Sequence, residues 1–278
     1  MPGTAQTLKA KLTEIRNSKY CPDDTQDYFS LATEMAEYLG SPDPELRDDL
    51  IYETFASWIE ADRFSPTQLK HLLYTCLDDS HLFNKIGESG GDSVFTRTFS
   101  LLVIALIIGS HRRKDFLARA DLASVKGKLV EYMRKEMDVR GYVDEKGWAH
   151  STAHAADVFN ELARCAEFTD PQDMMDILNA LRGKAMINDY IYIHKEDERM
   201  VTAAVSVLNR RILEEQAVIN WVESFLEIGK INKHPQDDYL RANVQSFLRS
   251  LYFRLLPDES KGHIRISLEV ITGKLSKF

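Results

Sequence analysis

Two histidines and an aspartate share a helical spacing in the middle of the chain, at His150, His154 and Asp157. Residues three and four apart lie on one face of a helix, so a helix that begins at about Trp148 would bring both imidazoles and the carboxylate together. Two histidines four residues apart can ligate one metal ion from consecutive turns, and a carboxylate one turn on adds an oxygen ligand. The spacing therefore indicates a metal site for Zn²⁺, Mn²⁺ or Fe²⁺, which nitrogen and oxygen ligands do not distinguish.

The pattern differs from the zinc-peptidase helix, in which a glutamate directly after the first histidine acts as the base. Ser151 stands at that position, so this mechanism is excluded. Glu198 begins another expected helix and is the candidate fourth ligand or base, with His150 as the other candidate catalytic group. The alternative interpretation is structural: the face that carries these residues is the polar side of a helix, on which Asp157 and Glu161 orient the imidazoles.

The loop before this helix carries groups that could bind a ligand. Arg140 and Asp144 lie on a stretch rich in turn residues, and Trp148 either stacks on a ligand or packs as an anchor. Histidines with acidic neighbours are expected to hold their protons above the pKa of free imidazole. A linked activity or stability should then change between about pH 6 and 8.

Helix-start signals recur along the chain and predict the elements that position these residues. Ser65-Pro66-Thr67-Gln68 combines an N-cap, a proline in the first turn and a capping-box partner, and Asp170-Pro171 repeats the cap and the proline. Four glycines are predicted as helix stops, namely Gly40, Gly87, Gly183 and Gly229.

The spacing of these signals predicts an all-α fold without strands. A pair of helices takes about 40 to 47 residues, the period of HEAT and armadillo arrays of stacked helix hairpins, and a compact multi-helix bundle is the alternative. No linker divides the chain, so residues 1–278 are predicted to form a single domain. Possible seams lie at residues 87–92 and 139–147.

Composition limits the classes of function. The 278 residues are 44% apolar, which excludes a disordered chain. They include 35 basic and 43 acidic side chains, a net charge of −8, which excludes a strongly basic nucleic-acid binder. Three cysteines without a close pair and a polar N-terminus favour a cytoplasmic protein. The apolar run 99–108 has about half the length of a membrane span and predicts a buried core helix. The basic residues 111–114 that follow form either a phosphate-binding patch or a favourable helix C-terminus.

The central stretch also carries a family resemblance. Arg140-Gly-Tyr, then Gly147-Trp148-Ala149-His150, Ala153 to Asp157 and Glu198-Arg199 resemble the bacterial family catalogued as domain of unknown function 2785. The resemblance implies a bacterial, cytoplasmic, helical protein and supplies no reaction. It supports testing five positions: Trp148, His150, His154, Asp157 and Glu198.

Two hypotheses of function follow. The first is a binding or scaffold protein whose polar groove holds a peptide, a protein or a small polar ligand. The second is a metal-dependent hydrolase in which His150, His154, Asp157 and Glu198 hold a divalent ion that activates water. A metal-free acid–base site on the same histidines is a weaker third hypothesis, because no nucleophile is evident.

Overall fold

The computed structural model describes residues 4–21, 27–228 and 232–276, so the predicted stop at Gly229 lies outside the described residues. Within these ranges the chain is all-α, as predicted. Its longer elements, in chain order, are the helices α1 (Ala5–Asn17), α2 (Tyr28–Glu37), the π-helix η1 (Glu45–Tyr52), α3 (Glu53–Glu60), α4 (Pro66–Cys76), α5 (Ser93–Lys114), α6 (Arg119–Lys135), α7 (Ser151–Ala163), α8 (Pro171–Ala185), α9 (Glu196–Asn209), α10 (Glu215–Glu223), α11 (Gln236–Leu255) and α12 (Gly262–Leu275). Two 3₁₀ turns complete the described helices, η2 (Ser224–Leu226) and η3 (Glu259–Lys261).

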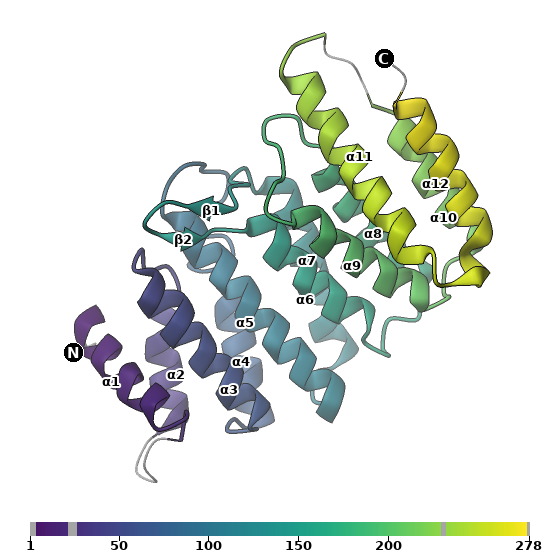
Figure 1. Ribbon diagram of the computed structural model, residues 1–278. Coiled ribbons are helices and arrows are strands. Elements are labelled where there is room, and N and C mark those ends of the chain that lie inside the picture. The colour runs from purple at the N-terminus through teal and green to yellow at the C-terminus, as the bar shows by residue number, and fades with distance from the viewer. Residues whose placement is uncertain (1–3, 22–26, 229–231, 277–278) are drawn as a thin grey trace.

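The helices pack in two rows. Helices α3, α5, α7, α9 and α11 lie side by side, each in contact with the next, and α2, α4, α6, α8 and α10 lie behind them (Figure 1). Successive helices also contact each other across the rows, as α4 does with α5 and α6 with α7. This packing agrees with stacked helix hairpins, although the assignment to the HEAT or armadillo class stays a prediction.

A short β-hairpin interrupts the helices and corrects the prediction of no strands. Strands β1 (Tyr142–Val143) and β2 (Gly147–Trp148) pair antiparallel within the predicted seam at 139–147. The sequence hid this hairpin because two residues per strand are too few to show an alternating pattern.

Helix α5 lies between α3 and α7 in the front row. It is the one helix in the described ranges that is long and apolar enough to cross a membrane, and 72% of its most apolar window is buried inside the protein. Its neighbours α3, α4 and α7 cover most of its surface, which explains why apolar residues occur all round it. The prediction of a core helix is thereby confirmed.

The two predicted seams contact each other. The Gly90 N–H donates to Asp138 Oδ2 at 2.9 Å, Arg140 Nη2 donates to the Gly91 carbonyl at 2.7 Å, and Lys146 pairs with Asp92 at 2.7 Å. The main cluster of buried apolar side chains meanwhile runs from α1 to α12. Residues 87–92 and 139–147 therefore join neighbouring elements, and the single domain stays a prediction.

The predicted helix starts agree better with the structure than the predicted stops. Ser65 and Gln68 form the capping box of α4, and Asp170 caps α8. Gly183 lies inside α8, so its prediction as a stop is wrong. Gly40 serves close packing, because a Cβ there would lie 2.0 Å from Thr96 Oγ1.

Several helix ends are closed by cations from distant segments. Lys184 Nζ donates to the Glu136 carbonyl after α6, Arg210 Nη1 to the Ala163 carbonyl of α7, and Lys261 Nζ to the Leu208 carbonyl of α9. Each cation satisfies a carbonyl that lacks a partner within its own helix and complements the helix dipole.

Candidate functional site

The start of α7 differs from the sequence prediction. The helix begins at Ser151, and His150 before it has a left-handed backbone with φ 53°. The β-hairpin holds this turn through hydrogen bonds from the Ala149 and His150 N–H groups to the carbonyls of Gly141 and Arg140. His150 therefore does not project as a helical residue would, and the hairpin sets its direction.

Trp148 and three histidines form a ring cluster at this end of α7. Trp148 stacks on His150 with 4.5 Å between ring centroids, and His150 meets His154 edge-on at 5.7 Å. His194, from the loop before α9, lies 5.4 Å from Trp148. The structure thus brings His150 and His154 together, and Trp148 packs on His150 and His194.

A buried carboxylate from α9 faces the ring cluster, and it belongs to Glu196. Glu196 Oε1 lies 3.5 Å from His150 Nε2 and 4.0 Å from His194 Nδ1, and within the described ranges it has no hydrogen-bond partner. Its other oxygen accepts the His194 N–H at 2.9 Å. Burial alone would raise the pKa of Glu196. The facing His150 and the backbone N–H groups of Glu196 and His194 outweigh this effect and hold the pKa below its usual value.

Glu198, the predicted fourth ligand or base, faces another helix. It is exposed, accepts a hydrogen bond from Ser250 Oγ at 2.7 Å and lies 3.6 Å from Arg254 on α11. The carboxylate beside the histidines is Glu196, which sequence reasoning missed. A signal was present, because Glu196 lies four residues before the buried Met200 and so shares the buried face of α9.

His154 is buried beneath the cluster, where 6% of its surface is exposed. Its Nδ1 donates to the Thr98 carbonyl at 3.2 Å, and its ring meets Phe99 edge-on. Burial, reinforced by the nearby charge of His150, lowers the pKa of His154 to about 3. The expectation of a raised histidine pKa is therefore wrong for His154, because no carboxylate pairs with its ring.

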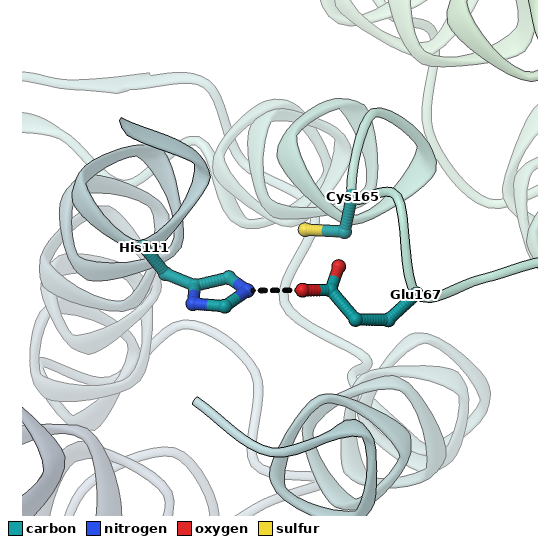
Figure 2. A group of neighbouring side chains, drawn as sticks. All are labelled: His111, Cys165 and Glu167. Carbon is teal, nitrogen blue, oxygen red and sulfur yellow. Dashed lines mark hydrogen bonds and ion pairs between the residues drawn. The ribbon is translucent and has the colours of Figure 1, made fainter. Parts of the chain in front are cut away.

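The predicted metal ligands do not converge as a set. His150 Nε2 is 3.1 Å from the His194 carbonyl, His154 Nδ1 is bonded to backbone, and Asp157 pairs with Arg199. Among the described residues, the one group whose three ligand atoms lie within 4.8 Å of one another is elsewhere, at His111, Cys165 and Glu167 (Figure 2).

The hydrogen bonds of that group favour a structural role. His111 Nδ1 accepts the N–H groups of Phe116 and Leu117, both at 3.0 Å, so the ring proton is on Nε2, which donates to Glu167 at 3.0 Å (Figure 2). Burial raises the pKa of the Cys165 thiol to about 12, so the sulfur keeps its proton. A metal ion would have to displace both protons and the backbone bonds that close the end of α5.

Arg140 and Asp144, predicted to bind a ligand, lie apart from each other. Arg140 donates through Nε and Nη2 to the buried Asp138, at 2.8 and 2.6 Å, and its Nη2 also donates to the Gly91 carbonyl, which joins the two loops. Asp144 is exposed in the hairpin turn. Neither side chain lines the cavity described next.

A groove of about 550 Å³ opens on the front row, beside the second half of α7. Its floor is a face of α5 on which Ala105, Leu106 and Gly109 are partly exposed, and its walls come from η1, α7 and α9. The lining residues are Tyr52, Leu102, Ala105, Leu106, Gly109, Arg112, Arg113, Asp157, Asn160, Glu161, Arg164 and Arg199. Of the predicted metal ligands, Asp157 alone lines it.

The groove has an excess of positive charge, with four arginines against two carboxylates. Arg199 pairs with Asp157, and Arg112 Nη1 lies 2.5 Å from Glu161 Oε2. Burial raises the pKa of Asp157 above its usual value despite Arg199. Arg113 has a backbone hydrogen bond, to Gly109, and no ion pair within the described ranges. An anion therefore meets more cations than the chain itself neutralises.

Sequence reasoning missed Tyr52 and Arg164, and it offered two roles for Arg112 and Arg113, a phosphate-binding patch or a favourable helix C-terminus. The basic run 111–114 does end α5, yet its arginines also line the groove. Tyr52 is the last residue of the π-helix η1, and such helices are frequent at functional sites. The π-helix could not be foreseen, because it follows from packing against other elements.

Comparison with known proteins gives a family without an assigned activity. A family model described as a protein of unknown function, DUF2785, matches residues 82–253. Neither the comparison with curated proteins nor the comparison with solved structures finds a match. The matched residues are more than half of the chain and include the ring cluster and all of the groove lining except Tyr52.

Proposed function

The chain belongs to the DUF2785 family, and we propose that it is a binding protein whose groove on α5 holds a small polar ligand. The observation that carries the proposal is the partly exposed apolar face of α5 at the bottom of a charged groove. Leu102, Ala105, Leu106 and Gly109 follow the 3.6-residue period of a helix face, which a neighbouring helix would normally cover.

The size and the lining of the groove agree with this proposal. Small-molecule sites usually measure about 300–1,000 Å³ and combine an apolar surface with a few polar groups that orient the ligand. The groove is about 550 Å³, and its polar groups come from four elements, η1, α5, α7 and α9. A peptide or a protein surface is the alternative occupant, and it would use the same groove.

The metal-dependent hydrolase has less support. It needs His150, His154, Asp157 and Glu198 around one ion, whereas His154 bonds to backbone beneath the cluster and Glu198 faces α11. The remaining pair, His150 and Asp157, supplies too few ligands for a stable site.

A groove-filling variant tests the proposal. Ala105→Phe places a ring on the floor of the groove, and Ala242→Phe places the same ring on an exposed position of α11 as a control. A library of small polar molecules would be screened by ligand-detected NMR against the parent chain and both variants. We expect hits that Ala105→Phe abolishes and Ala242→Phe retains. Hits that survive Ala105→Phe, or no hits in repeated screens, would contradict the proposal.

A further inference from the structure

We propose that the ligand of the groove is a small dianion whose two acidic groups, carboxylate or phosphate, lie about 6 Å apart. The inference rests on the proposed binding function and specifies its ligand. It depends on the number of cations in the groove, on their arrangement along α7 and on the donors that the chain leaves without a partner.

The charge of the groove is opposite to that of the chain. The whole chain carries −8, whereas the groove lining holds four guanidinium groups and two carboxylates, an excess of two positive charges. Guanidinium groups bind carboxylate and phosphate through paired hydrogen bonds, so arginine is the residue best suited to such anions. A ligand with two negative charges would neutralise the excess.

The ion pairs form two groups along α7, which we call the first and the second station. Arg199 holds Asp157 at the first, and Arg112 and Arg164 hold Glu161 at the second, with the Arg164 contact at 3.2 Å. Asp157 and Glu161 are four residues apart, so the stations are separated by about 6 Å of helix rise. This rise sets the expected distance between the two acidic groups of the ligand.

Two further donors are available in the groove. Arg113 makes no ion pair within the described ranges, and the Tyr52 hydroxyl has no hydrogen-bond partner there. Burial, reinforced by Glu53 and Asp157, raises the pKa of Tyr52, so the hydroxyl keeps its proton and can donate. An anion can accept these hydrogen bonds without breaking either ion pair.

The floor of the groove suits the segment that links the two acidic groups. Between the stations α5 presents Ala105, Leu106 and Gly109, which are small or aliphatic. A short chain of methylene groups would lose contact with water on this surface, which favours binding. Glutarate has this form, and so does propane-1,3-diyl bis(methyl phosphate), whose two phosphodiester groups carry one negative charge each.

Calorimetric titration of the full chain tests the inference with three probes: glutarate, propane-1,3-diyl bis(methyl phosphate) and valerate, which has one carboxylate. We expect one of the two dianions to bind at least tenfold more tightly than valerate, because the second acidic group adds charge-assisted hydrogen bonds. Its affinity should fall as NaCl is raised from about 50 to 500 mM, because salt screens exposed charges.

Arginine variants connect this affinity to the groove. Arg113→Gln breaks no ion pair and should weaken the binding of the dianion about tenfold, as should Arg199→Gln at the first station. Arg249→Gln, at an exposed position of α11, is the matched control and should leave the affinity unchanged.

The outcomes separate the two proposals. Three outcomes would contradict the proposal that the ligand is a dianion. They are equal binding of valerate and the dianions, no effect of Arg113→Gln and Arg199→Gln, and binding of acidic peptides alone. If neutral molecules bind and Ala105→Phe abolishes their binding, the groove remains the binding site, and the proposal of a dianionic ligand is contradicted. If Ala105→Phe affects no ligand, both proposals fail.

Discussion

Polar side chains lie at both ends of α7, but they are enclosed at the first end and open at the second. At the first end, His154 bonds to the Thr98 carbonyl and His150 stacks under Trp148, so the imidazoles find their partners within the chain. At the second end, Asp157 and Glu161 line an open groove beside more arginines than they neutralise. The residues with the most familiar catalytic chemistry are therefore the more enclosed ones. The candidate site is therefore identified by its opening to ligands and by its excess of arginines over carboxylates.

The comparison can be tested with one substitution at both ends. Gly141→Ala in the ring cluster would place a Cβ 2.2 Å from His194 Nδ1, and overpacking of this kind costs about 2–3 kcal/mol of unfolding free energy. Gly109→Ala on the groove floor meets Glu161 at an ordinary 3.5 Å and should add up to about 1 kcal/mol through helix propensity. Urea denaturation measures both changes. Equal effects would mean that the two ends are packed alike.

Acid should destabilise the ring cluster through His154. Its pKa is about 3 when folded against a usual value of 6.5, so between these values the unfolded chain binds more protons and stability falls as the pH falls. The loss begins near pH 6.5 and reaches about 2 kcal/mol at pH 5. His154→Asn keeps a donor for the Thr98 carbonyl but cannot titrate. Denaturation midpoints should depend less on pH in this variant, and an unchanged pH dependence would contradict the assigned pKa.

Glu196 and Glu198 offer a matched pair on α9. Glu196→Gln should cost about 1–2 kcal/mol at pH 7, because it removes a buried charge with charge-assisted contacts. Glu198→Gln should change stability by less than about 0.5 kcal/mol, because its partners are exposed. The pKa of Glu196 is lowered, so its contribution is present above pH 4.5 and is lost as the pH falls through the folded pKa. Thermal unfolding at pH 7 and pH 3 distinguishes these outcomes.

The smallest expected effect on stability is at the groove. Arg113→Gln should change the free energy of unfolding by less than about 0.5 kcal/mol, because Arg113 is exposed and makes no ion pair within the described ranges. Chemical denaturation of the ligand-free chain checks this expectation. A loss above 1 kcal/mol would show that Arg113 supports the fold, and its effect on ligand affinity would then need a separate explanation.

Sequence patterns predicted the helices well where the signal was local. The capping box at Ser65 and the burial of α5 could be predicted because a side chain and its own backbone, or one apolar run, carry the information. The start of α7 was misplaced by three residues, because the turn at His150 depends on pairing with residues eight or more positions away. The stop predicted at Gly183 was wrong because α8 continues past it to Ala185.

The candidate site was predicted in part. The helical period placed Asp157 and Glu161 one turn apart on one face, which the groove confirms. The period could not identify the groove itself, because Tyr52 and Arg112 reach it from segments far away in the chain. Nor could it decide between Glu196 and Glu198, whose positions differ by two residues and whose side chains face different helices.

The sequence alone determined that the chain is helical, acidic and built around an apolar α5, because these properties depend on composition and on contacts within a few residues. The tertiary structure decided which polar groups are enclosed and which remain open. Burial and ion pairing are sums over neighbours from several helices, and no single segment contains that sum. For this reason the histidines are enclosed among other side chains, and the arginines around Asp157 and Glu161 form the candidate binding site.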